Sequence, residues 1–273
     1  MNYNSLLGSK LAKYFNKKYG IITYSGTLAI EVALKSLKLK RKSKVLISSN
    51  VCYSIINTVL KLGLVPVIKT PNNGLFFTND DIDVVIDKEI IDCILLVHQF
   101  GILNNISKRK YKKLNIKIIE DVAQTWDLKD NNGMNNIGID SDIVVTSFGS
   151  TKPISYGIGG GLFFDNKKIF KEIDFCDNES REKQGIILSY AYPLCKEIKL
   201  DYLLEKANEI VNEQRLCARE YSNVLLNQKT IKYINYEQNS GNVWHRFPMW
   251  VENQKTFEKI KKILEKSTLE FQF

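Results

Sequence analysis

The chain has 273 residues, of which 44% are hydrophobic and 11% aromatic, so wholesale disorder is excluded. This length suits one large domain with a smaller one beside it. The formal net charge is +9, but the basic residues are spread over several helical and turn segments. Such spacing is typical of solvated faces, and no basic helix or aromatic RNA-binding signature accompanies it. We therefore expect no nucleic-acid partner.

The cysteines and the N-terminal residues bear on the cellular compartment. The five cysteines are Cys52, Cys93, Cys176, Cys195 and Cys217. Their odd number and the lack of a CxxC pair favour reduced thiols over disulfides or a zinc site. Only two histidines are available, so we expect no metal. The N-terminus lacks a signal-peptide apolar core, and no segment reaches about 18 consecutive apolar residues. We expect a cytoplasmic protein that spans no membrane.

Up to about residue 165 the chain alternates between helical and strand-like segments. Helical spacing of apolar residues predicts an opening helix over 5–18 and another over 25–37. Short apolar runs follow at 44–49, 65–70, 92–100, 116–123, 142–148 and 159–165, with polar helical segments such as 54–63 between them. Runs of this length are typical of strands buried on both faces. The pattern predicts an α/β fold with a largely parallel sheet flanked by helices.

A different pattern begins after residue 165. Residues 199–228 predict a long helix with few breakers. Two strand candidates (231–238 and 245–252), a helix (256–266) and a final strand-like stretch (269–273) follow it. We therefore expect a large α/β domain over 1–198 and a small α+β domain over 199–273. The small domain is expected to be incomplete.

Small, acidic and basic residues follow the predicted strands, at the edge where open α/β sheets bind ligands. Ser25-Gly26-Thr27 opens a helix whose first amides could hold a phosphate, although a helix cap without a ligand is the favoured reading of this segment by itself. Glu120 and Asp121 could be metal ligands, a general base or a cap. Ser147, Lys152 and a glycine run over 157–161 follow another strand.

These residue types together suit pyridoxal 5'-phosphate (PLP). That cofactor needs a lysine for a Schiff base, a carboxylate beside its pyridine nitrogen, and hydroxyls and amides for its phosphate. Lys152, Asp121 and Ser147 with the turn at Gly26 supply these groups, and glycines let the cofactor approach the backbone. A solvated loop charge is the alternative reading of Lys152.

Five segments resemble, in order and at similar spacing, the DegT/DnrJ/StrS family of PLP-dependent nucleotide-sugar aminotransferases. They are an SGT-x-A-x-x-x-A-L helix start at 25–34, a strand–loop–helix running into 62–70, an H-x-F/Y-G element at 98–101, an E-D-x-A-Q motif at 120–124, and an S-F-x-x-T-K segment with glycines at 147–161. The resemblance covers residues 3–165 well and the remainder loosely. It implies the PLP-dependent transferase fold type I, with a mostly parallel sheet of the seven-stranded type.

The resemblance also implies roles for single residues. Lys152 resembles the Schiff-base lysine, which later acts as the general base, and Asp121 resembles the partner of the pyridine nitrogen. Gln124 looks like the residue near the phenolic oxygen of the ring. The expected phosphate cup consists of Ser147, Gly26, Thr27 and Leu28. The aromatic residue that stacks on the ring in the family corresponds here to Cys52 or Tyr53, and Gly149 replaces a common histidine.

The implied activity is transfer of an amino group from glutamate or a similar donor to a keto group of a nucleotide-linked sugar, in polysaccharide biosynthesis or a similar pathway. The implied assembly is a homodimer. Two alternatives stay open. One is a fold-related PLP enzyme of another reaction type, although dehydratases of the family carry histidine in place of the lysine. The other is a degenerate or truncated non-catalytic member, because the chain is shorter than typical members and is expected to stop inside the small domain.

Overall fold

The structure, a computed structural model, describes residues 6–129, 133–155, 157–169, 200–228, 231–237, 241–251 and 253–266. The helices are α1 (Leu6–Tyr14), α2 (Gly26–Ser36), α3 (Tyr53–Lys61), α4 (Asn79–Ile86), α5 (Lys108–Lys113), α7 (Leu200–Leu225) and α8 (Gln254–Leu264), with a 3-10 turn η1 (Gln99–Gly101). The strands are β1 (Tyr19–Thr23), β2 (Lys44–Ser48), β3 (Val65–Lys69), β4 (Cys93–Val97), β5 (Lys117–Asp121), β6 (Ile143–Ser147), β7 (Gly160–Phe164), β8 (Ile231–Tyr233) and β9 (Met249–Val251).

The first seven strands form one sheet in the order β1-β7-β6-β5-β4-β2-β3. Strands β6, β5, β4, β2 and β3 run parallel, as expected. Strand β7 is antiparallel to both of its neighbours, β1 and β6. The register pairs Ser147 with Gly160, so the chain turns back at the carboxyl edge of β6 and re-enters the sheet there. The expected mostly parallel α/β sheet is confirmed.

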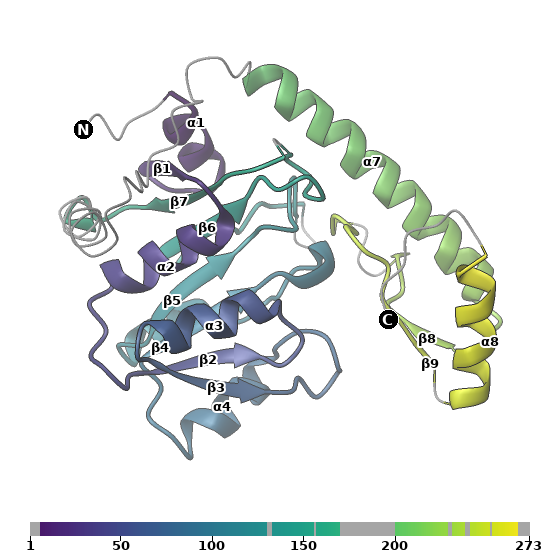
Figure 1. Ribbon diagram of the computed structural model, residues 1–273, viewed down its shortest axis with the longest axis horizontal. Coiled ribbons are helices and arrows are strands. Elements are labelled where there is room, and N and C mark those ends of the chain that lie inside the picture. The colour runs from purple at the N-terminus through teal and green to yellow at the C-terminus, as the bar shows by residue number, and fades with distance from the viewer. Residues whose placement is uncertain are drawn as a thin grey trace.

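Helices cover both faces of this sheet (Figure 1). Ile21 and Phe164 belong to a core cluster with α2 and α3, whereas their neighbours Ile22 and Phe163 belong to a cluster with α1 and the first half of α7. Helices α4 and α5 bury Ile82 and other side chains against β2, β4 and β5, on the same face of the sheet that α1 covers. Because successive residues of a strand point to opposite faces, burial on both faces accounts for the continuous apolar runs.

The long helix α7 connects the sheet to a small C-terminal unit. It runs from the neighbourhood of α1 to α8 and the β8–β9 ribbon (Figure 1). Ala207 packs in the α1 cluster, while Ala218, about three turns further along α7, packs with Trp244 of the C-terminal unit. Strands β8 and β9 pair antiparallel with each other. The long helix, both strands and the last helix were all expected in this order.

Both C-terminal strands are shorter than expected. The extended stretch predicted from 245 begins only at Met249, because the Arg246 amide donates to the carbonyl of Phe100 and Pro248 has no amide to donate. Strand β8 ends at Tyr233, and the Tyr236 amide donates to the hydroxyl of Ser222 on α7 instead of to a neighbouring strand.

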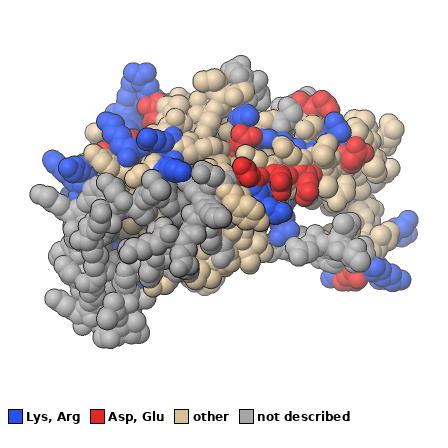
Figure 2. All heavy atoms as spheres, turned by 90° about the horizontal axis from the view of Figure 1, so that it is seen from above, with Lys and Arg blue, Asp and Glu red and all other residues tan. Residues whose placement is uncertain are grey.

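Several expectations fall outside the described residues: the final strand at 269–273, Cys176, Cys195 and the domain boundary at 198/199. That boundary stays a prediction. In the described part of the chain, no helix combines the length and apolar character needed to cross a bilayer. On the face drawn in Figure 2, the Lys and Arg side chains stand in separate groups with acidic residues between some of them, as the dispersed basic charge of the sequence predicted.

Candidate functional site

The start of α2 and the end of β6 touch at the carboxyl edge of the sheet. A Cβ atom placed on Gly26 would lie 2.7 Å from the Cβ of Ser147, so only glycine permits this approach. A Cβ on Gly160 would lie 2.5 Å from the Gly26 nitrogen, so β7 passes as closely on the other side. The structure thus brings together two of the segments expected to form a phosphate cup.

The first turn of α2 keeps donors available at this edge. Ser25 has an extended backbone and its Oγ accepts the amide of Leu28 at 3.1 Å, which makes it the N-cap. The amides of Gly26 and Thr27 precede the first amide that finds an acceptor inside the helix. They lie at the positive end of the helix dipole, where an anion is stabilised. Leu28, expected in the cup, is thus bonded through its amide to Ser25.

Asp121 ends β5 and Lys152 follows the parallel strand β6, so both lie at the same carboxyl edge of the sheet. Asp121 ends β5 and is only 6% exposed, and its Oδ1 accepts the Ala123 amide at 2.9 Å. Burial raises the pKa of its carboxyl, while the Ala123 amide and the charge of Lys152 act against the rise. Lys152 lies half-buried in the turn after β6. Its positive charge lowers the pKa of the Asp121 carboxyl.

Gln124 lies in the turn after β5 and is held through its side chain. Its Oε1 accepts the Phe100 amide at 2.6 Å. Phe100 has a φ of 60°, in the left-handed region that is uncommon for residues other than glycine. With its oxygen engaged, Gln124 has its NH2 group as the end that can donate to a ligand.

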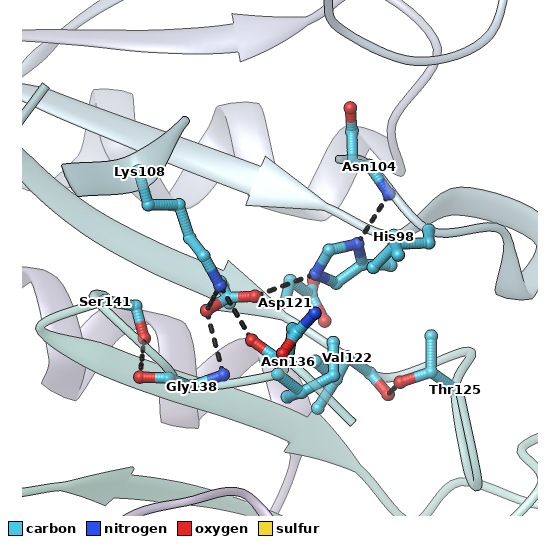
Figure 3. A network of polar contacts seen from close by, with 12 residues as sticks. His98, Asn104, Lys108, Asp121, Val122, Thr125, Asn136, Gly138 and Ser141 are labelled. Carbon is cyan, nitrogen blue, oxygen red and sulfur yellow. Dashed lines mark hydrogen bonds and ion pairs between the residues drawn. The ribbon is translucent and has the colours of Figure 1, made fainter. Parts of the chain in front are cut away.

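The side chains of Glu120 and Asp121 lie on opposite faces of the sheet, because the two residues are neighbours in β5. Its carboxylate is fully buried and contacts the Lys108 ammonium at 2.9 Å, the Gly138 amide at 3.0 Å and His98 Nε2 at 3.0 Å (Figure 3). Burial opposes ionisation, but the charge of Lys108 and the bond from His98 outweigh it and hold the Glu120 pKa at about 2. The helix-cap reading of the acidic pair is not borne out, because residues 122–129 form turns and no helix, and Asp121 accepts the Ala123 amide in one of them. Glu120 lies in an ion-pair network that none of the three readings included. Across the described ranges, no three His, Cys, Asp or Glu side chains are grouped as a metal site.

His245 is a candidate that the sequence did not single out. It comes from the C-terminal unit and reaches the site because Gly101 has no side chain. A Cβ on Gly101 would lie 2.9 Å from the backbone nitrogen of His245 and 2.9 Å from the backbone carbonyl oxygen of Gln124. Burial lowers the pKa of His245 to about 4, and the charges of Lys152 and Arg246 add to the effect. Its Nδ1 is buried and finds no hydrogen-bond partner among the described residues. Only the scarcity of histidine in the chain could have drawn attention to it.

Cys52 and Tyr53, the two candidates for stacking on the cofactor ring, begin α3 after β2. The strand is parallel to β4 and β5, so they stand at the same edge of the sheet as Asp121. Cys52 is exposed and its sulfur lies 3.1 Å from the Ser54 hydroxyl, while Tyr53 is 71% exposed. The choice between the two residues stays a prediction.

This arrangement of motifs matches a known family. The sequence profile of the DegT/DnrJ/EryC1/StrS aminotransferase family matches residues 2–273. The chain belongs to this family. The match extends through the C-terminal unit, where the resemblance of individual motifs was loose. Together with the fold, it makes this a chain of the type I PLP-transferase architecture.

Individual relatives are distant. The chain is 25% identical over 271 residues to the 3-oxo-glucose-6-phosphate:glutamate aminotransferase of Bacillus subtilis (strain 168), covering 93% of this chain and 59% of that protein. It is 23% identical over 259 residues to the GDP-perosamine synthase of Escherichia coli O157:H7, covering 91% and 68%. The solved structure of NtdA from Bacillus subtilis, with its bound cofactor PMP, superposes with a TM-score of 0.75 at 25% identity, covering 95% of this chain and 61% of NtdA. The chain therefore spans about three fifths of the length of the first of these relatives.

The residues at the carboxyl edge fit PLP. A phosphate needs close backbone approach and backbone donors; the contact of Gly26 with Ser147 provides the first and the N-terminus of α2 the second. A pyridine nitrogen needs a carboxylate, which Asp121 supplies from a buried position at the edge where Lys152, the amine that the cofactor requires, follows β6. These groups come from β5, β6 with the turn after it, and α2.

Proposed function

We propose that this protein is a PLP-dependent aminotransferase that moves an amino group from glutamate to a keto group of a nucleotide-linked sugar. One observation carries the proposal: the buried Asp121 ends β5 at the edge of the sheet where Gly26 touches Ser147 and where Lys152 follows β6. Family membership and the printed activities of the relatives support the same chemistry.

Each residue has a distinct task in this proposal. When bound, PLP supplies an electron sink for the carbon that loses its proton. Lys152 would hold the cofactor through Nζ and would serve as the general base for the proton on the Cα of the donor. Asp121 provides the negative charge opposite the ring nitrogen. Ser147 and the first amides of α2 bind the phosphate, and the NH2 group of Gln124 donates to the ring oxygen.

The first experiment tests cofactor binding and its attachment point. PLP is added to the purified protein, the absorption spectrum is recorded, and the complex is reduced with borohydride for peptide mass spectrometry. We expect a visible band and a modified peptide containing Lys152. The Lys152→Ala variant loses both, while Lys167→Ala, which removes an exposed lysine beyond β7, keeps both. No band at saturating PLP would overturn the proposal in favour of a non-catalytic member.

The second experiment tests the amino donor and acceptor. We expect glutamate to bleach the visible band as the amino group moves to the cofactor, and a nucleotide-linked keto sugar to restore it. A keto sugar phosphate is the second candidate acceptor, because the relative that is 25% identical is named for 3-oxo-glucose-6-phosphate. Restoration of the band by the sugar phosphate alone would exclude the nucleotide-linked substrate. A cofactor that glutamate cannot convert would point to another reaction type.

We also propose that the protein acts as a homodimer. Large apolar side chains are exposed near the carboxyl edge of the sheet: Tyr24 is 38% exposed, Tyr53 71% and Ile158 50%. A second subunit over this edge would cover them, which is the usual reason for such a patch. Size-exclusion chromatography with light scattering tests this, and a PLP-loaded monomer would contradict it.

A further inference from the structure

The buried carboxylate of Glu120 is surrounded only by donors. Its Oε1 accepts hydrogen bonds from the Lys108 ammonium at 2.9 Å and the Gly138 amide at 3.0 Å, and its Oε2 lies 3.0 Å from Nε2 of His98. A carboxylate is an acceptor at both oxygens, whereas a carboxamide accepts at one end and donates at the other. In either orientation, a carboxamide here would turn an N–H group toward another donor.

His98 is held in one tautomer by this arrangement. Its Nδ1 accepts the Asn104 amide at 3.0 Å, so the ring proton lies on Nε2 and points to Glu120 (Figure 3). The ring is 1% exposed. The His98 amide donates to the carbonyl of Asp121 at 3.0 Å, and the Asn104 side chain donates to the carbonyl of Val97 at 3.0 Å. Both ends of the segment from His98 to Asn104 are therefore fixed to the ends of β4 and β5.

This fixed segment reaches a residue of the proposed cofactor site. It contains Phe100, whose left-handed backbone persists only if its surroundings hold it. The Phe100 amide is the donor to Gln124 Oε1 at 2.6 Å. The orientation of the Gln124 carboxamide thus depends on a backbone turn that the His98 side chain anchors from the other face of the sheet.

We propose that Glu120 and His98 are positioning residues for the cofactor site. Glu120 accepts the Nε2–H group of His98 and fixes the ring, His98 fixes the turn at Phe100, and the Phe100 amide holds Gln124 with its NH2 group toward the ligand. Lys108 supplies the counter-charge that keeps the buried carboxylate paired. This inference rests on the proposed function, because Gln124 has a ligand to meet only if PLP binds.

The first test uses the protein without cofactor. With two histidines in the chain, ¹⁵N-labelled histidine gives two pairs of ring nitrogen signals, and a His245→Gln sample assigns them. We expect the Nε2–H tautomer for His98 in the parent protein, and a shifted Nε2 signal in Glu120→Gln because the N–H group loses its carboxylate acceptor. Hydrogen exchange at the Phe100 amide should accelerate about ten-fold or more in that variant. The matched control is Lys110→Met on α5, which removes a charge paired with Asp83 at the surface. An unchanged Nε2 signal and unchanged exchange in Glu120→Gln would overturn the inference whether or not PLP binds.

The second test measures the Kd for PLP by absorption titration, on variants whose circular dichroism shows that they are folded. We expect Glu120→Gln to bind roughly ten-fold more weakly than Lys110→Met, because a misdirected Gln124 loses its bond to the ring. Glu120→Asp keeps two acceptors and should recover part of the affinity. A loosened turn with an unchanged Kd would overturn the positioning role. If the parent protein binds no PLP, the proposed function fails, while the first test still decides whether Glu120 and His98 hold the turn.

Discussion

Gly26 and Ser147 lie in direct contact where α2 begins and β6 ends. A Cβ on Gly26 would stand 2.7 Å from the Cβ, 3.2 Å from the Oγ and 3.3 Å from the Cα of Ser147. Two of these three atoms belong to the rigid part of the strand end, so the conflict cannot be relieved by rotating a flexible side chain. The helix start and the strand end therefore keep their spacing only while residue 26 is glycine.

The first prediction follows from this contact. Gly26→Ala should lower the free energy of unfolding by about 1–3 kcal/mol, because α2 must move away from β6 to admit the methyl group. It should also weaken PLP binding by opening the phosphate cup. Urea unfolding and absorption titration measure the two effects.

Gly149→Ala is the matched control for stability. A Cβ there would meet nothing closer than Ser147 Oγ at 3.6 Å, which is ordinary contact. Its free energy of unfolding should stay within about 0.5 kcal/mol of the parent protein. Equal losses in the two variants would contradict the steric explanation.

The second prediction concerns the attachment of the C-terminal unit. Arg215 on α7 donates to the Asp127 carboxylate at 2.9 Å and to the backbone carbonyls of Asp127, Gly241 and Asn242. Arg215→Met keeps the apolar stem but removes these four hydrogen bonds, at a cost of about 2 kcal/mol, although Lys129 still contacts Asp127 and the Gly241 carbonyl. Limited proteolysis should then cut faster near residue 241. Arg219→Met, one turn along, removes only a 4.0 Å surface pair and should leave both measurements unchanged.

Much of the fold could be predicted from local patterns, because continuous apolar runs and helical spacing depend on neighbours in the sequence. The strands from Lys44 to Phe164 and the site residues at their ends follow from such patterns and from the rule that ligands bind at carboxyl edges. The face of the sheet on which the Glu120 side chain lies also follows from strand alternation, because Glu120 immediately precedes Asp121 in the sequence. What local patterns could not predict is the approach of His245, which depends on Gly101 meeting a segment more than a hundred residues away.

The third prediction is a loss of stability in mild acid caused by His245. Its pKa falls from 6.5 to about 4 on folding, chiefly through burial. Between these values the unfolded chain binds more protons than the folded one, so stability falls as the pH is lowered from 6.5 toward 4. His245→Gln should flatten this part of the curve of unfolding free energy against pH. Lys152→Ala should narrow the pH range over which stability falls, because it removes a positive charge that opposes protonation of His245. A slope that survives in His245→Gln would assign the effect to another group.

The fourth prediction concerns stronger acid and Glu120. Its pKa is held at about 2 in the folded protein against 4.5 as an ordinary value. The stabilisation is therefore complete above about pH 4.5 and is lost as the pH falls toward 2, because the carboxylate must be protonated against its ion pair. Glu120→Gln starts from a lower stability but should lose less of it across this window.

Two lysine variants sharpen the test of Glu120. Lys108→Met removes the adjacent charge, so the folded-state pKa of Glu120 should rise toward 4.5 and less stability should be lost between pH 4.5 and 2. Lys110→Met on the same helix removes a surface charge paired with Asp83 and should leave the size of that loss unchanged. Urea unfolding at a series of pH values gives the slopes. Parallel curves for the parent protein and Glu120→Gln between pH 4.5 and 2 would show that the buried carboxylate is not what makes the fold acid-sensitive in this window.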